Sequence, residues 1–377
     1  MDAGVENLQI GLFNSIVAQP SNQECGFFAI SLALDPTLAT RARVSTRVSA
    51  PANSWRCSLR FLIGLICLLL IQTRTTCAQE IEPAQKERAT TTNRYLIVDA
   101  LRYTWHLRPN AILEQNGIVY ETNSFGLRDV EFSLAKPEGT LRIVCLGDSV
   151  TYGAGVSFEE TYERQLEKTL GARGFDAKVV NAGIGSQCAW HGLERLEKDV
   201  IRFNPDMVAI CFGLNDGALS SQTLWDEWKT KLAQRKSSGF INQQRIDSIH
   251  QGKSMRLVPS VPLAEFETHL RTLVAQLRTR TQAKVYLLTF NSVSEDYQNS
   301  QWSPELRRRQ RSVYGEYRHR VLEIARKMKL KSADVYQRFE RSEKSLLNPD
   351  GIHPNAEGMA VYADELFKQI LSDLGVR

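Results

Sequence analysis

Short apolar runs alternate with longer segments of helical periodicity between residues 139 and 375. The runs are rich in β-branched residues and have the length of strands, whereas the longer segments carry apolar residues every three or four positions. The pattern predicts strands over 141–146, 177–181, 207–212, 284–290 and 332–336. It predicts helices over 159–173, 189–203, 263–281, 304–329 and 356–374. Strands separated by helices indicate an α/β fold with a five-stranded parallel sheet covered on both faces.

Two of the expected helices begin next to residues that favour capping. Ser303 precedes Pro304, which combines a good N-cap with proline in the first helical position. Asn355 precedes the apolar periodicity of 356–374 and is also a favourable N-cap. We therefore expect helices to begin directly after residues 303 and 355.

The segment 95–138 precedes this alternating region and has its own pattern. Two extended runs flank Asn116-Gly117, a dipeptide that favours the two-residue turn of a β-hairpin. We therefore expect a small β accessory element with a hairpin in front of the α/β domain. The alternation of strands and helices is interrupted by a long polar segment, 217–261, which contains Trp225 and Trp228. This segment follows the third strand and is expected to overhang the site.

The N-terminal residues differ in composition from the rest of the chain, since the first lysine is Lys86. Two arginines precede an uncharged apolar run over 61–71, and small residues follow at 75–78, which is the order of a signal peptide. A helix over the run would be about 17 Å long, well short of the ~30 Å hydrocarbon core of a bilayer. We therefore interpret residues 55–78 as a signal peptide or a short membrane anchor.

A signal peptide usually starts at the N-terminus, so one at residue 55 lies unusually deep. We therefore expect translation to start near Val44 or Val48. Residues 1–43 are then either outside the translated protein or disordered, and residues 1–54 together are interpreted as a leader that is disordered where it is present. Residues 79–94 are polar without periodicity and are interpreted as a linker. Together these features predict a secreted or periplasmic protein whose membrane contact is confined to residues 55–78.

Composition narrows the classes of partner and cofactor. The 47 basic and 42 acidic residues give a net charge of only +5, which argues against a nucleic-acid partner. Four of the seven cysteines lie in the first 77 residues, and the remaining three, Cys145, Cys188 and Cys211, are too few for a disulfide framework or a four-cysteine zinc site. Gly153-Ala-Gly155 lacks the third glycine of a dinucleotide-binding loop, because Phe158 stands there. We expect neither a metal nor a cofactor.

Chemistry-bearing residues follow four of the expected strands. These segments are Gly147-Asp148-Ser149, 181–186, Gly213-Leu214-Asn215-Asp216 and 348–354, the last of which contains Asp350 and His353. Ligands of open parallel sheets bind at the carboxyl ends of the strands, so these four segments are expected to converge.

The converging residues have the types that nucleophilic catalysis needs. A serine hydroxyl requires a base, and that base requires a third group to hold one tautomer; Ser149, His353 and Asp350 can fill these roles. The spacing of three between Asp350 and His353 lets one turn bring the carboxylate to the imidazole. The side chain of Asn215 and backbone N–H groups of Ser149 and of the Gly185-Ser186 turn are candidate donors to an oxyanion. Asp148 and Asp216 are interpreted as structural, and His191 is expected in the core or at the pocket wall.

These blocks resemble the GDSL or SGNH hydrolase family, which comprises serine esterases and lipases of flavodoxin-like fold. Gly-Asp-Ser, Gly-x-Asn-Asp and Asp-x-x-His-Pro occur in that order, and the resemblance covers roughly residues 139–375. The resemblance implies that Ser149 is the nucleophile, His353 the general base, Asp350 its orienting acid and Asn215 part of the oxyanion hole. It also implies a three-layer α/β/α domain over 139–377.

Two residues depart from the family pattern. Val150 stands where leucine is usual, which is a packing change. Ser186 occupies the position of the usual oxyanion-hole glycine, five residues after Asn181. A backbone donor survives this exchange, and the donor is either Ser186 or Gly185.

The sequence therefore predicts an exported serine ester hydrolase that forms an acyl-enzyme on a small O-acyl ester, with an acylated carbohydrate as the expected substrate. Three alternatives stay open. They are an O-acyltransferase that uses the same serine, a lysophospholipase or lipase, and a non-catalytic carbohydrate-binding relative.

Overall fold

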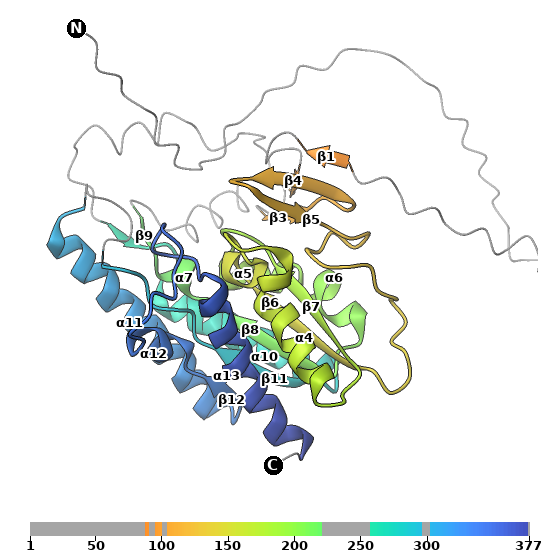
Figure 1. The fold of residues 1–377 in the computed structure, drawn as a ribbon. Helices are drawn as coiled ribbons and strands as arrows, with labels where there is room; N and C mark the ends of the chain where they lie inside the picture. Colours follow the sequence, from red (N-terminus) through yellow and green to blue (C-terminus); the bar gives the residue numbers. More distant parts are fainter. Residues whose placement is uncertain (1–86, 90–94, 100–103, 221–256, 296–301, 376–377) are drawn as a thin grey trace, which may run out of the picture. The chain divides into compact units, whose positions relative to one another are not determined.

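A computed structural model describes residues 87–89, 95–99, 104–220, 257–295 and 302–375 (Figure 1). The expected leader over 1–54 and the expected signal peptide or anchor over 55–78 lie outside these ranges, as do most of the expected linker over 79–94 and both Trp225 and Trp228. Among the helices of the described ranges, none has the length and apolar character needed to cross a bilayer.

The core of the fold is a five-stranded parallel sheet in the order β12-β11-β8-β6-β7. Its strands are β6 (Leu141–Gly147), β7 (Ala177–Gly183), β8 (Met207–Cys211), β11 (Lys284–Leu288) and β12 (Lys331–Ala333). All residues of β8 and nearly all of β6 are buried, because helices cover both faces of the sheet. The order corresponds to the flavodoxin-like arrangement, in which the strand order reverses next to the first strand, here β6.

Helices form the two outer layers. On one face α13 (Ala356–Leu374) packs against α4 (Tyr162–Ala172), and on the other α10 (Leu263–Arg280) packs against α5 (Ala189–Glu194) and α11 (Pro304–Lys327). The predicted three-layer α/β/α architecture is therefore confirmed.

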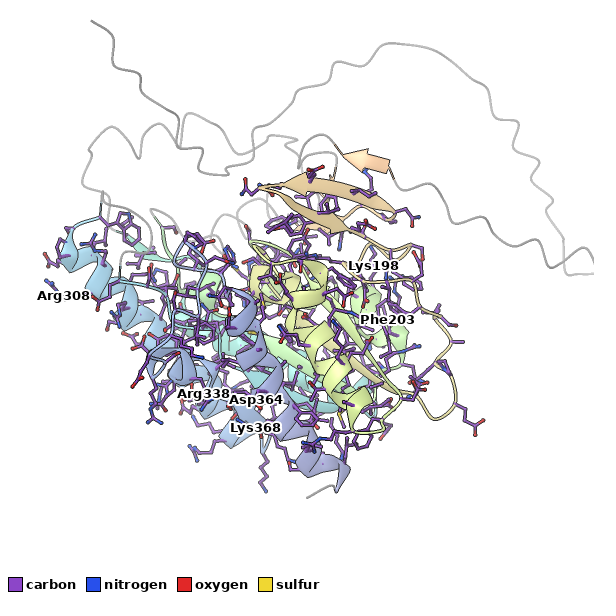
Figure 2. The ribbon with its side chains drawn as sticks, in the orientation of Figure 1. Lys198, Phe203, Arg308, Arg338, Asp364 and Lys368 are labelled. Carbon is purple, nitrogen blue, oxygen red and sulfur yellow. The ribbon has the colours of Figure 1, made fainter. Side chains whose placement is uncertain are left out.

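Helix α13 illustrates how the sequence pattern produces these layers. Its inner face buries Met359, Tyr362 and Leu366. On its outer side the carboxylate of Asp364 forms an ion pair with the ammonium group of Lys368 at 2.6 Å, and Figure 2 labels both residues. Such exposed pairs contribute little to stability, so the buried face holds the helix in place.

Both predicted helix starts are confirmed. The Ser303 side chain accepts a hydrogen bond from the N–H of Leu306 at 3.2 Å, with Pro304 in the first turn. The Asn355 side chain accepts one from the N–H of Gly358 at 2.9 Å. Each cap satisfies an N–H group that has no partner within its helix.

Several predicted elements differ from the structure. The predicted helix 159–173 starts as a 3₁₀ turn over Phe158–Glu160, and α4 begins only at Tyr162. The predicted strand 332–336 ends at Ala333, because the Asp334 side chain caps a new helix, α12 (Val335–Glu340). The predicted helix 189–203 is divided into α5, α6 (Leu196–Asp199) and the 3₁₀ turn η2 (Ile201–Phe203). The division after α5 falls at Arg195, whose fully buried guanidinium donates to the carbonyls of Ala182 and Gly147.

The segment before the sheet forms the expected β accessory element. Strands β4 (Ala111–Gln115) and β5 (Ile118–Glu121) make a hairpin, and Asn116 (φ 52°) and Gly117 (φ 74°) form its turn. Strands β2 (Leu96–Asp99) and β3 (Thr104–Leu107) pair antiparallel. Within the expected linker, β1 (Glu87–Ala89) adds to β4, so this part of the segment is a strand.

The accessory element is anchored to the loop that follows α3 (Ser149–Tyr152), the short helix of the predicted nucleophile. Fully buried Arg128 donates to the carbonyls of Tyr152 at 2.9 Å and Val156 at 2.8 Å. The Tyr120 ring stacks on that of Tyr152 at 5.3 Å. These contacts fix the loop behind Ser149. The short elements η1 (Phe158–Glu160), α7 (Leu214–Gly217) and the antiparallel pair β9 (Leu219–Ser220) and β10 (Val258–Pro259) complete the described fold.

Candidate active site

Ser149 and His353 meet at the carboxyl end of the sheet. Ser149 is the first residue of α3, immediately after β6, and its Oγ lies 2.9 Å from Nε2 of His353. The two residues are 204 positions apart in the chain. Ser149 is partly exposed, so its hydroxyl lies within reach of a substrate. A serine within hydrogen-bond distance of an imidazole is the arrangement that activates a hydroxyl for attack.

Asp350 holds His353 in the orientation that a base needs. Its Oδ2 lies 2.6 Å from Nδ1 of His353, and its Oδ1 accepts the N–H groups of Ile352 at 2.8 Å and His353 at 2.9 Å. Because the carboxylate only accepts, Nδ1 carries the hydrogen and Nε2 presents its lone pair to Ser149. Burial acts to raise the pKa of Asp350, but the hydrogen bond to His353, the imidazole's charge and the two N–H groups outweigh it and lower the pKa.

Asn215 lies between the nucleophile turn and the turn that follows β7. It belongs to α7, and its Nδ2 donates to the carbonyl of Gln187 at 3.0 Å and to Oδ2 of Asp148 at 3.3 Å. The longer bond to Asp148 is the weaker, so an oxyanion beside Ser149 would compete for that hydrogen. The structure thus brings Asn215 to the site, and its role as an oxyanion donor stays a prediction.

Ser186 and Gly185 lie in the turn after β7. Ser186 is exposed and has a left-handed backbone with φ 62°, the region that favours glycine. The N–H of Ile184 donates to the carbonyl of Gly147 at 3.2 Å, which ties this turn to the end of β6. The carbonyl of Gly185 accepts the indole N–H of Trp105 at 3.1 Å. The turn therefore lies next to the nucleophile, in contact with the accessory element.

Two buried carboxyl groups accept backbone N–H groups of the helices around the site. Asp148 caps α3 by accepting the N–H of Val150 at 2.9 Å, and burial raises its pKa to about 6. Asp216 accepts the N–H of Ala189 at 3.0 Å, and burial, reinforced by the charge of Asp148, raises its pKa to about 8. Both contacts agree with the structural roles expected from the sequence.

His191 is a core residue. Its Nδ1 accepts the N–H of Cys188 at 3.0 Å, its ring stacks on Trp190, and burial holds its pKa well below the usual range. Among the described residues, no group of three or more His, Cys, Asp or Glu side chains is arranged to hold a metal ion.

Sequence reasoning missed three residues that organise the site, namely Trp105, Arg128 and Arg195. The two arginines are fully buried and donate to backbone carbonyls around α3 and the end of β6. Buried arginines are rare, so their sequence positions carried no signal. Trp105 contacts a turn 80 residues away, which periodicity cannot reveal.

Comparison with known proteins places this geometry in a family. A model of the GDSL-like lipase/acylhydrolase family matches residues 145–361. An arylesterase of Vibrio mimicus is 31% identical over 83 residues, which cover 22% of this chain and 42% of that protein. Esterase TesA of Pseudomonas aeruginosa is 33% identical over 75 residues, which cover 20% of this chain and 37% of that protein. The chain thus spans about two fifths of the length of these curated relatives.

Solved structures give similar matches. A lipase/acylhydrolase from Enterococcus faecalis is 21% identical with a TM-score of 0.44, covering 62% of this chain and 96% of that one. A catalytic mutant of Axe2, an acetylxylan esterase from Geobacillus stearothermophilus, is 20% identical with a TM-score of 0.41, covering 63% and 95%. The family resemblance expected from the sequence is confirmed by the family match, which spans more than half of the 377 residues. The chain belongs to the GDSL-like lipase/acylhydrolase family.

Proposed function

We propose that this protein is a serine ester hydrolase that cleaves O-acyl esters through an acyl-enzyme. The observation that carries the proposal is the continuous chain of contacts from Asp350 Oδ2 to His353 Nδ1 at 2.6 Å and from His353 Nε2 to Ser149 Oγ at 2.9 Å. Family membership and two relatives named as esterases support it.

The reaction proceeds in two halves. Nε2 of His353 takes the proton of Ser149 as Oγ attacks the ester carbonyl, and the resulting imidazolium is stabilised by the carboxylate of Asp350. The imidazolium then gives its proton to the departing alcohol oxygen, which leaves the acyl group on Ser149. Water then attacks the acyl carbon while Nε2 of His353 takes its proton. The imidazolium returns that proton to Oγ of Ser149 as the acid leaves, which restores both the serine hydroxyl and the neutral imidazole. N–H donors next to Ser149 stabilise the oxyanion of each tetrahedral intermediate.

For the substrate, we propose a small O-acyl ester of a carbohydrate, met outside the cytoplasm. The support is the apolar run over 61–71 with its flanking residues, which favours export, where acylated polymers are accessible. The arylesterase and esterase names of the curated relatives are compatible with small esters.

Hydrolysis of p-nitrophenyl acetate by the parent protein and by Ser149→Ala tests the ester-hydrolase proposal. We expect kcat to fall at least ~10³-fold in the variant with unchanged cooperative unfolding, since removal of the nucleophile disables the triad as a unit. Equal activity of the two proteins would refute the proposal.

The substrate class needs a second assay. We expect acetylated oligosaccharides to be cleaved with higher kcat/KM than fatty-acyl esters of increasing chain length. A preference that rises with chain length would instead indicate a lipase. Transfer of the acyl group to an added sugar at the expense of hydrolysis would indicate an acyltransferase.

A further inference from the structure

We propose that Trp105, on a strand outside the residues that match the family, positions the N–H of Ser186 as an oxyanion-hole donor. The inference rests on the proposed ester hydrolysis and deepens it. It assigns part of the catalytic geometry to the accessory element, and it selects Ser186 over Gly185 as the backbone donor.

Trp105 holds the turn after β7 at two points. Its indole N–H donates to the carbonyl of Gly185 at 3.1 Å, and its own backbone carbonyl accepts Nε2 of Gln187 at 2.8 Å. Gln187 is fully buried, so its side chain has no access to water as a replacement partner. One residue of β3 therefore binds the residues on either side of Ser186.

The planarity of the peptide bond turns the first contact into an orientation of Ser186. In a trans peptide the carbonyl of one residue and the N–H of the next lie in one plane and point in opposite directions. The hydrogen bond that fixes the carbonyl of Gly185 towards Trp105 thus directs the N–H of Ser186 away from the accessory strand. Within the described ranges this N–H meets no acceptor, and Ser186 itself is exposed.

The turn is also tied to the nucleophile on its far side. The N–H of Ile184 donates to the carbonyl of Gly147, two residues before Ser149. Asn215 binds the carbonyl of Gln187 and the carboxyl group of Asp148 with the same amide nitrogen. The Ser186 N–H therefore lies in a segment whose two ends are fixed to the nucleophile turn and whose middle is fixed by Trp105.

The conformation of Ser186 explains why this middle contact matters. A serine with φ 62° is strained in this left-handed backbone conformation, so the turn needs contacts from outside to hold it. Loss of the indole N–H removes the hydrogen bond that orients the Gly185 carbonyl, so the Gly185–Ser186 peptide can tilt between its two fixed ends. Misplacement of a donor by about 1 Å can lower the rate of a reaction by ~10²-fold.

The test compares Trp105→Phe with a matched control, Tyr95→Phe. The phenylalanine at 105 keeps an aromatic ring beside His191, where the indole makes an edge contact at 4.8 Å, and removes the donor. Tyr95→Phe also removes one hydrogen-bonding group between the accessory element and α3, since the Tyr95 hydroxyl accepts that of Tyr152 at 3.3 Å. That bond does not reach the turn after β7.

We expect Trp105→Phe to lower kcat for p-nitrophenyl acetate by roughly 10- to 100-fold with KM within about twofold, because the donor acts on the transition state. Tyr95→Phe should keep the kcat of the parent, and its melting temperature should be similar to that of Trp105→Phe. A second variant carries 3-benzothienylalanine at position 105, in which sulfur replaces only the indole N–H. It should show the same loss of kcat, and it tests the inference even where the phenylalanine variant does not fold.

A second readout follows the donor itself. After Ser149 is phosphorylated by diethyl p-nitrophenyl phosphate, the amide proton of Ser186 should move downfield in the NMR spectrum of the parent and move less in Trp105→Phe. Activity that depends on Ser149 but is equal in the parent and both position-105 variants would overturn this inference alone. Absence of Ser149-dependent hydrolysis in the parent would overturn the proposed function, and the inference with it.

Discussion

Replacing Asp350 by asparagine separates the two tasks of this carboxylate. Oδ1 accepts the N–H groups of Ile352 and His353, which shape the turn, and Oδ2 accepts Nδ1 of His353. An asparagine oxygen can replace Oδ1, so the turn is retained. Its NH₂ group then faces Nδ1 and donates, which forces the hydrogen of the imidazole onto Nε2. In that tautomer His353 donates towards Ser149 and cannot accept its proton.

The expected loss follows from this tautomer and from the exposure of the site. For a buried triad carboxylate the same exchange lowers kcat by about 10⁴. The Asp350 side chain is 44% exposed, so water can relieve part of the mismatch. We therefore expect a loss of roughly 10³ in kcat, about 4 kcal/mol of barrier.

Asp350→Ala is the matched variant. It loses the turn contacts as well but presents no opposing donor, so His353 regains the useful tautomer. We expect the alanine variant to be less stable than the asparagine variant and at least as active, as measured by thermal unfolding and by p-nitrophenyl acetate hydrolysis. An asparagine variant that is clearly more active than the alanine variant would refute the tautomer argument.

The lowered pKa of Asp350 adds a pH test. A carboxyl group whose pKa is lower in the folded state contributes stability above its unfolded value near 4, and this contribution is lost as pH falls through the folded pKa. The difference in melting temperature between the parent and Asp350→Asn should therefore shrink on acidification below about pH 4. A difference that stays constant from pH 6 to pH 2 would contradict this assignment.

Three further predictions concern the groups around the triad. Asn215→Ala should lower kcat by roughly 10²–10³ with little change in KM, as for loss of one oxyanion donor, and steady-state kinetics would measure it; a change in KM alone would contradict that role. The pKa of Asp216 is raised to about 8 in the folded state, so between about pH 4 and pH 8 the carboxyl group ionises only on unfolding, and the free energy of unfolding falls as pH rises. Asp216→Asn should therefore have a higher melting temperature than the parent at pH 8 but not at pH 4. The opposite order would exclude a buried neutral carboxyl group. Gly183→Ala should destabilise the fold strongly, because its Cβ would lie 2.0 Å from the backbone N of Tyr152, whereas Gly185→Ala meets open space and should fold like the parent in thermal unfolding.

The sheet and the triad could be predicted because their signals are local. Four of the five strands, all but β12, are largely apolar runs. Parallel strands also bring their carboxyl ends to the same end of the sheet, so the meeting of Ser149 and His353 follows from topology. The end of β12 was missed because one side chain, Asp334, caps α12 inside the predicted strand 332–336. The capping hydrogen bond sets the boundary between β12 and α12, and the strand pattern of the sequence does not show it.

The supports of the site could not be predicted, because they are contacts between segments with no shared pattern. The indole of Trp105 and the guanidinium of Arg128 both bind backbone carbonyls, which every residue possesses. Nothing in the sequence selects the carbonyl that such a donor will meet. Packing of the accessory element against the sheet domain makes the choice, and only the three-dimensional structure contains it.

The long separation between Ser149 and His353 has a kinetic consequence. Their contact closes a loop of 204 residues. His353 reaches Ser149 only when the segment between β12 and α13 has packed at the carboxyl end of the sheet. Contacts this distant along a chain form late in folding, after local helices and neighbouring strands. Recovery of esterase activity during refolding should therefore lag behind recovery of the helical circular dichroism signal. The activity would then report the packing of the segment that carries His353.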